Sequence, residues 1–206
     1  MKPLYPFPHL NPLPHAGEDT NDRYTNFTLT NTYTRTARAL HWLIALLIFT
    51  VFPLGLYMHD LKLSPAKLQL YSYHKWIGMI ILLLTIIRLL WRITHRPPAL
   101  SLPRFEQIAS SAVHHLLYVL MLAVPLTGWL MSSAKGFPTV LFGILPLPDL
   151  LTKDKVLGQT LENVHASLNY LLLLLVTVHI AAALKHHFID RDDVLARMLP
   201  KGNNHA

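Results

Sequence analysis

Apolar residues are concentrated in four long segments of the chain, with more polar stretches between them. The segments cover about residues 37–58, 68–91, 108–131 and 166–185. Each contains roughly the ~20 residues that an α-helix needs to cross a ~30 Å hydrocarbon core. Because unpaired backbone polar groups cannot face lipid, each segment is expected to form a continuous helix. The pattern predicts an all-α membrane protein, a bundle of four transmembrane helices.

The composition supports this prediction. Of the 206 residues, 52% are hydrophobic and only 14% are charged, whereas soluble domains carry nearer ~25% charged residues. One compact bundle in a membrane is the simplest explanation of these values. Membrane lipid is therefore the first predicted partner of the chain.

The two ends of the chain differ from the bundle. Residues 1–34 combine five prolines with a polar run and lack the basic start and apolar core of a signal peptide. Proline spacing of this kind opposes helix formation. We predict a disordered N-terminal tail at residues 1–34, a four-helix transmembrane domain at residues 35–200 and a short C-terminal tail at residues 201–206.

Basic residues predict the orientation in the membrane. If the N-terminal tail, the segment between the second and third spans and the C-terminal tail share one side, that side has twelve Lys and Arg residues, including every arginine, against six on the other. The positive-inside rule then places both termini in the cytoplasm. The net charge of +7 is explained by topology and anionic lipid. No basic stripe interleaved with exposed aromatics is present, so nucleic acid is not expected as a partner.

Two histidines of the fourth segment have an informative spacing. His165 and His179 stand fourteen residues apart in an almost entirely apolar stretch. On a helix this spacing brings both side chains to within about 40° of one face and separates them by about 21 Å along the axis. Imidazoles inside a membrane are expensive without partners. Either the two are helix-end side chains with ordinary hydrogen bonds, or each binds a separate haem iron, and this pair alone does not decide.

Other histidines lie at the ends of the remaining spans. His41 begins the first span, His74 lies near the start of the second, and His114 begins the third. With the predicted topology, His41, His114 and His179 lie toward the cytoplasm, and His74 and His165 lie toward the outer side. The outer two make one axial pair, and the inner three make a second pair with one to spare.

This arrangement fits bis-histidine haems, in which iron takes two axial nitrogens and the macrocycle fills the space between helices. A zinc or copper site would need its ligands in one cluster, and these histidines lie at two levels. The chain has no cysteine, which excludes Cys-ligated iron–sulfur clusters and covalent c-type haem. The predicted fold is therefore a four-transmembrane-helix bundle that encloses two b-type haems.

Small residues and one arginine complete the expected site. Gly78, Gly128 and the alanines at 181–183 would let a macrocycle approach, although ordinary helix packing uses the same residue types. Arg88 lies at the end of the second span, where an unpaired charge would be costly. It is expected either to contact a haem propionate or to extend to the cytoplasmic interface.

Five sequence motifs occur in the order in which a known family carries them. They are Leu40-His41-Trp42, Tyr73 to Gly78 (YHKWIG), His114 and Tyr118 with Pro125 to Trp129 (PLTGW), His165 with His179, and Ala181 to Phe188 (AAALKHHF). Over about residues 35–200 the chain resembles the prokaryotic cytochrome b-561 family. The resemblance implies a diheme b-type cytochrome of the bacterial inner membrane that exchanges electrons with quinone. In one branch of the family, superoxide is oxidised outside and ubiquinone is reduced.

Carried onto this chain, the resemblance implies ligands for each iron. His74 and His165 would bind the outer haem, and His41 and His179 the inner haem. His114 lies at the inner level, where it is expected as an alternative to His41, as a propionate contact or as part of a quinone site.

Three functional hypotheses follow. The leading one is electron transfer through two haems b from a periplasmic donor, such as superoxide, to the ubiquinone pool, as a superoxide:ubiquinone oxidoreductase. The alternative is an electron-carrier or anchor subunit for a separate dehydrogenase or hydrogenase at the outer face. The third is a haem-free transporter or structural bundle whose histidines carry protons. Residues 132–163 are expected to form the longest outer loop, whose Lys135, Lys153 and Lys155 would attract an anion such as superoxide.

Overall fold

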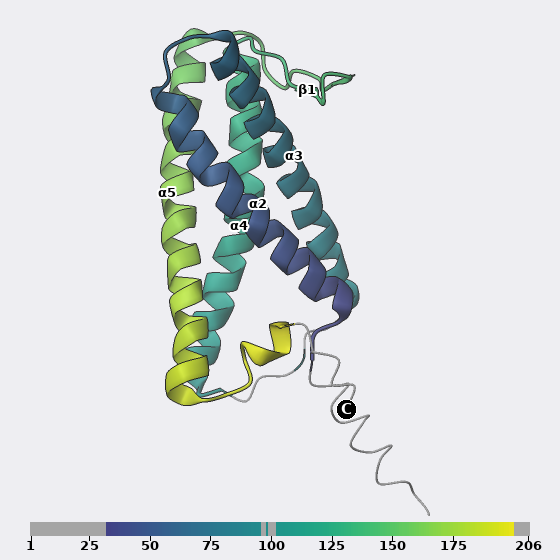
Figure 1. Cartoon of the computed structure of the whole chain (residues 1–206), viewed down its shortest axis with the longest axis vertical. Coiled ribbons are helices and arrows are strands. Elements are labelled where there is room, and N and C mark those ends of the chain that lie inside the picture. The colour runs from purple at the N-terminus through teal and green to yellow at the C-terminus, as the bar shows by residue number, and fades with distance from the viewer. Residues whose placement is uncertain (1–31, 96–97, 99–101, 200–206) are drawn as a thin grey trace, which may run out of the picture. The chain divides into compact units, whose positions relative to one another are not determined.

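The computed structural model describes residues 32–95, 98 and 102–199. The predicted tails, residues 1–34 and 201–206, fall almost wholly outside the described residues and stay predictions. Within the described part the chain forms four long helices (Figure 1). These are α2 (Arg35–Asp60), α3 (Pro65–Thr94), α4 (Arg104–Ala134) and α5 (Lys155–Lys185).

Polar caps set where three of these helices begin. The side chains of Thr34, Ser64 and Asp154 each accept a hydrogen bond from a backbone amide in the first turn of α2, α3 and α5. Such a bond satisfies one of the amides that a helix start leaves unpaired. Pro65 occupies the first turn of α3, where its missing N–H costs nothing.

The expected long loop at residues 132–163 is shorter than predicted. Helix α4 continues to Ala134, and α5 begins at Lys155 rather than near residue 166. The first turns of α5 are polar, so hydropathy did not mark them as part of the helix. Their helical conformation follows from the Asp154 cap, whose carboxylate accepts hydrogen bonds of 2.9 Å and 3.0 Å from two successive amides.

Helices that follow one another in the chain pack side by side: α2 on α3, α3 on α4, and α4 on α5. Leu117 and Leu120 of α4 and Leu172 of α5 form the buried centre of the last contact. In a membrane the alternative to this contact is lipid, so close van der Waals packing of these side chains, and not their removal from water, stabilises the pair.

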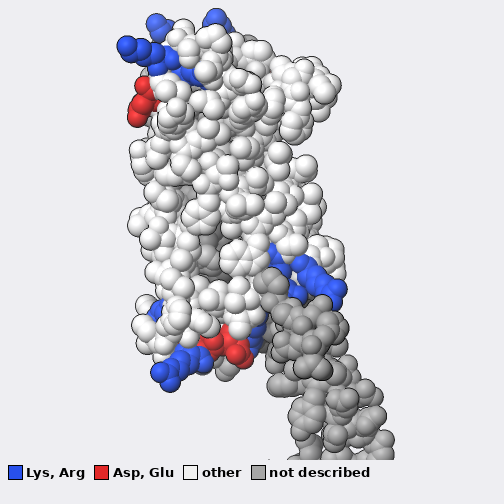
Figure 2. Space-filling view, in the orientation of Figure 1, with Lys and Arg blue, Asp and Glu red and all other residues white. Residues whose placement is uncertain are grey.

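The sides of the bundle are apolar. Large side chains such as Leu46, Phe49, Leu83 and Leu174 are exposed on different helices. Figure 2 shows that the charged residues of one face gather toward the two ends, with an uncharged band between them. All four helices have the length and hydropathy of membrane spans. The predicted four-helix membrane bundle is therefore confirmed.

The two ends of the bundle carry different connections (Figure 1). At what we call the hairpin end, residues 135–154 join α4 to α5 and contain β1 (Val140–Leu141) paired antiparallel with β2 (Leu145–Pro146). At the tail end, α5 continues into one turn of π-helix, η1 (His186–Asp190), and then a 3₁₀ helix, η2 (Ala196–Met198). Arg191 between them adopts a left-handed backbone with φ of 56°, which turns the chain away from α5.

Each of the four tryptophans binds a segment outside its own helix. The indole N–H of Trp42 donates to the Met198 carbonyl, and that of Trp76 donates to the Val140 carbonyl. The indole N–H of Trp91 donates to the Thr34 hydroxyl, and that of Trp129 donates to the Pro148 carbonyl. These side chains lie at the ends of the bundle, where tryptophan is enriched in membrane proteins. Here they also fix the connecting segments to the helices.

Candidate functional site

The five histidines singled out in the sequence lie at two levels of the bundle. At the hairpin end, His74 of α3 faces His165 of α5, with ring centres 6.3 Å apart and ring planes at 78°. At the tail end, His41 of α2 faces His179 of α5, at 6.1 Å and 78°. The His114 ring of α4 lies 5.2 Å from that of His179. The expected outer and inner groups are thus brought together in space.

The separations can be compared with what a metal ion between two imidazoles requires. Two in-line bonds of about 2.0 Å from ring nitrogens to the metal leave the ring centres about 6.2 Å apart. The His74–His165 and His41–His179 distances of 6.3 Å and 6.1 Å match this value. The His114–His179 distance of 5.2 Å is too short for such a linear arrangement. The donor set therefore fits one iron in each of two pairs.

Hydrogen bonds orient two of the rings. His165 Nδ1 lies 3.0 Å from the Val124 carbonyl, and His114 Nδ1 lies 2.7 Å from the Ser110 carbonyl. Because a carbonyl can only accept, Nδ1 is the protonated nitrogen in both rings. Nε2 is then left with a free lone pair, and histidines that bind metals usually have their second nitrogen engaged in this way.

Glycines allow helix backbones to lie close to the hairpin-end rings. A Cβ at Gly55 would lie 3.0 Å from His74 Cε1, and one at Gly128 would lie 3.1 Å from His165 Cε1. Gly128 was among the small residues expected to give room, but Gly55 was not, because a single glycine in an apolar helix carries no signal of what lies beside it. At Gly78 an added Cβ would meet no atom within 4 Å.

A cavity of about 690 Å³ opens at the hairpin-end pair. His74, His165 and all three of these glycines line it, together with apolar side chains such as Phe52. Its volume lies within the range of about 300–1,000 Å³ typical of cofactor and ligand sites. The open space at Gly78 belongs to this cavity, so a side chain there would reduce the room for a flat ligand.

Arg88 is held inside the bundle at the tail-end level. Its Nε donates to the Tyr118 hydroxyl at 3.0 Å, and its Nη1 donates to the Ala37 carbonyl at 2.8 Å. The guanidinium therefore connects α3 with α4 and α2. Both expectations for Arg88, a propionate contact and extension to the cytoplasmic interface, stay predictions.

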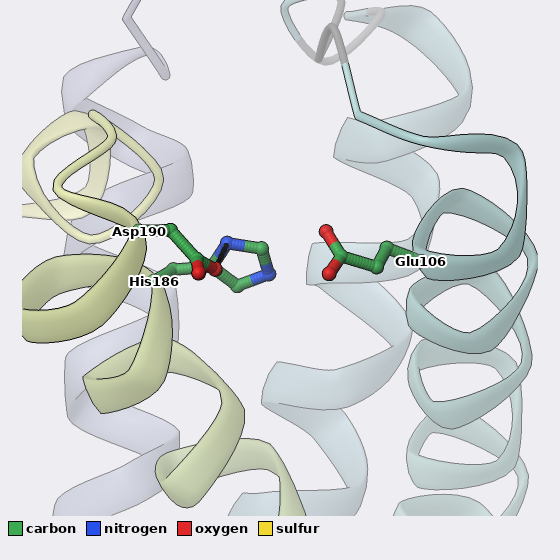
Figure 3. Close-up of side chains that lie close together, drawn as sticks. All are labelled: Glu106, His186 and Asp190. Carbon is green, nitrogen blue, oxygen red and sulfur yellow. Dashed lines mark ion pairs between the residues drawn. The ribbon is translucent and has the colours of Figure 1, made fainter.

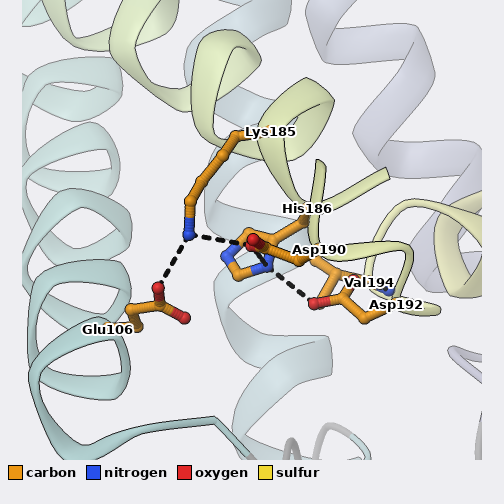
Figure 4. Close-up of polar contacts among 6 residues, drawn as sticks. All are labelled: Glu106, Lys185, His186, Asp190, Asp192 and Val194. Carbon is orange, nitrogen blue, oxygen red and sulfur yellow. Dashed lines mark hydrogen bonds and ion pairs between the residues drawn. The ribbon is translucent and has the colours of Figure 1, made fainter. Parts of the chain in front are cut away.

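A further polar cluster lies where α5 ends. The Glu106 carboxylate of α4 and the His186 and Asp190 side chains offer ligand atoms within 4.8 Å of one another (Figure 3). However, the Lys185 ammonium lies 2.8 Å from both Glu106 and Asp190 (Figure 4). These carboxylates thus already share a cation, and the cluster serves as a junction between α4, α5 and η1.

His186 takes part in this junction rather than in headgroup contacts. It is buried, and its Nδ1 lies 2.7 Å from Asp192 and 3.1 Å from Asp190. Asp192 Oδ1 also accepts from the Val194 amide at 3.0 Å (Figure 4). Asp190 lies one turn after His186 within η1, and the turn at Arg191 folds Asp192 back onto the ring.

A four-helix membrane bundle with two levels of paired histidines is typical of a membrane cytochrome of the b type, and comparison with known proteins indicates the same class. The family model described as prokaryotic cytochrome b561 matches residues 32–201. The chain belongs to this family, whose members bind haem b and transfer electrons in membranes. The four apolar helices and this prokaryotic family together indicate a bacterial inner-membrane protein.

Individual relatives cover most of the chain. Cytochrome b561 homolog 2 of Escherichia coli (strain K12) is 35% identical over 170 residues, which cover 81% of this chain and 90% of the relative. Cytochrome b561 homolog 1 of the same organism is 27% identical over 176 residues, covering 83% and 98%. A probable superoxide oxidase, CybB, of Yersinia pestis is 28% identical over 174 residues, covering 79% and 92%.

Proposed function

We propose that the chain carries single electrons across the membrane through two haems b. His74 and His165 would hold the haem at the hairpin end, and His41 and His179 the haem at the tail end. The observation that carries this proposal is the pair of ring separations, 6.3 Å and 6.1 Å, each suited to one iron between two imidazoles. When bound, haem b supplies a one-electron ferric/ferrous couple.

Helix α5 determines the spacing of the two sites. It contributes one ligand to each pair, and fourteen residues at a rise of about 1.5 Å separate their Cα atoms by about 21 Å. One site thus lies toward each end of the bundle. Because the two ligands belong to one continuous helix, the spacing between the sites is rigid.

The neighbouring groups have separate roles. The Val124 carbonyl holds the proton of His165 at Nδ1, which keeps Nε2 available to iron. Arg88 places a positive charge at the tail-end level, and its Nε and Nη1 are already bound to Tyr118 and Ala37. We assign its remaining amino group, Nη2, to a haem propionate, since charge-assisted bonds of this kind are strong.

We place His114 beside the tail-end haem rather than on its iron. Its ring is 5.2 Å from that of His179, closer than two in-line bonds allow. A protonated propionate, or a quinol hydroxyl at this level, would donate a hydrogen bond to its unprotonated Nε2.

Alanine variants of the five histidines test the ligand assignment. Pyridine haemochrome analysis of the purified protein should give two haems per chain. His74→Ala and His165→Ala should each lose one haem, His41→Ala and His179→Ala should each lose the other, and His114→Ala should keep both. Reduced-minus-oxidised spectra distinguish the two sites. One haem in the unmodified protein, or loss of a haem in His114→Ala but not in His41→Ala, would contradict the assignment.

For the electron donor and acceptor we propose superoxide at the hairpin end, taken as the periplasmic side, and ubiquinone. The similarity to a probable superoxide oxidase supports this choice. Lys153 and Lys155 are exposed at that end, where they would attract an anion. Lys135 contributes less than expected, because it lies 2.7 Å from the Glu162 carboxylate.

Superoxide should therefore reduce the haems of the purified protein, and added ubiquinone should reoxidise them. Raising the salt concentration should slow the reduction of the haems by superoxide. At ~0.1 M salt, the attraction between an anion and exposed lysines is largely screened beyond about 10 Å. The double variant Lys153→Gln/Lys155→Gln should weaken this salt dependence. The control is Lys62→Gln, in the connection between α2 and α3 at the same end, which should leave the salt dependence unchanged. Haems that stay oxidised under superoxide, but are reduced on addition of a partner dehydrogenase, would favour an electron-carrier subunit instead.

A further inference from the structure

The connection between α4 and α5 carries apolar side chains that neither histidine pair uses. Residues 136–148 contain no charged residue. Around the turn of the hairpin, Phe142, Ile144 and Leu145 are 58%, 83% and 57% exposed. Figure 1 shows the hairpin extending sideways from the helices rather than continuing their direction. In water, such a cluster of apolar side chains would be unfavourable.

The hairpin is fixed at its base. The Trp76 indole donates to the Val140 carbonyl at 2.7 Å, and Lys75 Nζ donates to the Phe137 carbonyl at 3.0 Å. The Leu147 amide donates to the carbonyl of Thr139, which is buried. The direction in which the apolar tip points is therefore determined by α3.

The tip lies at the level where α3 changes from polar to apolar. Before Lys75 the helix contains Gln69 and Ser72, and after Trp76 it is apolar, apart from Thr85, as far as Ile87. Lysine followed by tryptophan at such a transition is typical of a membrane interface. The Phe142 ring packs 5.3 Å from the Trp76 ring, which places the hairpin at the same depth.

We propose that the tip of this hairpin inserts into the lipid leaflet at the hairpin end, with Phe142, Ile144 and Leu145 at the boundary between headgroups and acyl chains. The hairpin lacks charge, and antiparallel pairing of Val140 with Pro146 and Leu141 with Leu145 uses part of its backbone hydrogen-bonding capacity. Both properties lower the cost of leaving water. A lipid surface fits better than a protein partner because the hairpin extends laterally from the helices (Figure 1), into the plane that the bilayer occupies. The inference depends neither on haem nor on which face of the membrane this end occupies.

The absence of cysteine allows a direct test. Ile144→Cys and, as a matched site in the same connection, Lys153→Cys are labelled with an environment-sensitive fluorophore, and the full chain is reconstituted into phosphatidylcholine vesicles. The label at position 144 should emit at shorter wavelength and lose most of its intensity when lipids with a shallow spin label are included. The label at position 153 should show neither change. Since the Ile144 side chain is 83% exposed, its replacement leaves the bundle intact.

Two results would overturn the proposal. If the label at position 144 shows the same emission wavelength and the same quenching as the label at position 153, the tip lies in water. A shielded label that spin-labelled lipids do not quench is covered by protein instead. A second experiment places the label at Leu145→Cys. Adding Ile144→Asp should remove the quenching by spin-labelled lipids, because a charge at position 144 draws the tip toward water. Adding Lys153→Asp instead should leave the quenching unchanged. Equal quenching in both would also contradict insertion.

Discussion

The hairpin-end histidine rings lie against helix backbone, and this proximity depends on glycine. A Cβ at Gly55 would lie 3.0 Å from a ring carbon of His74, and a Cβ at Gly128 would lie 3.1 Å from a ring carbon of His165. Contacts of that length force neighbouring atoms to move. Because the His165 ring is also held by the Val124 carbonyl, it cannot turn aside without losing a hydrogen bond. The orientation of the His165 ring, a proposed ligand, therefore depends on both the Val124 carbonyl and the absence of a side chain at position 128.

Gly128→Val should consequently weaken binding at the hairpin-end site. Overpacking of this kind costs about 1–3 kcal/mol, and here the displaced group is a proposed ligand. We expect the purified variant to contain less hairpin-end haem and a normal amount of tail-end haem, measured by pyridine haemochrome analysis and difference spectra.

The comparison variant is Ala181→Val, which adds bulk at an exposed position of α5. It should keep the haem content of the unmodified protein. Full occupancy of both sites in Gly128→Val would show that the ring has another way to accommodate a side chain.

At the scale of helices and connections, hydropathy predicted the middle of each span but not its ends. An apolar run reports the part of a helix that lies in lipid, whereas Thr34, Ser64 and Asp154 determine where α2, α3 and α5 begin. The start of α5 was missed for this reason. The junction around His186 was also missed, because Asp190 contacts the ring through a turn of π-helix and Asp192 only after the left-handed turn at Arg191.

The segment after α5 should depend on His186 and not on its neighbour His187. His186 is buried between two carboxylates, whereas His187 is exposed. Removing the imidazole leaves Asp192 without a partner that helps to fold the segment back, and hydrogen bonds to charged groups contribute about 1.5–3 kcal/mol.

We therefore expect His186→Ala to be cleaved faster than the unmodified protein by a protease acting after residue 190, and His187→Ala to be cleaved at the original rate. The haem spectrum serves as a check that the bundle is intact. Equal cleavage of the two variants would mean that Trp42 and Arg38, which bind the Met198 and Leu199 carbonyls, hold the segment without His186.

For the molecule as a whole, periodicity indicated that His165 and His179 share a face, but which histidines meet them follows from the arrangement of all four helices. His41 and His114 begin different spans and were both candidates at the inner level. In the bundle both rings approach His179, at 6.1 Å and 5.2 Å. Only these distances distinguish a proposed ligand from a neighbour, and spacing along the sequence contains no such information. The sequence was therefore sufficient for the two levels but not for the role of His114.

The same arrangement carries a prediction about orientation. Every arginine from Arg35 onward that the structure describes lies on helix segments or connections of the tail end, whereas Lys62, Lys67, Lys135 and Lys153 lie at the hairpin end. An excess of arginine and lysine marks the cytoplasmic side, so we expect the tail end, with both termini, in the cytoplasm. Alkaline phosphatase, which is active only outside the cytoplasm, should be inactive when fused after residue 206 and active when inserted after Lys62, in the connection between α2 and α3. The reverse pattern would turn the bundle over, and the proposed superoxide-facing histidine pair would then be His41 and His179 instead of His74 and His165.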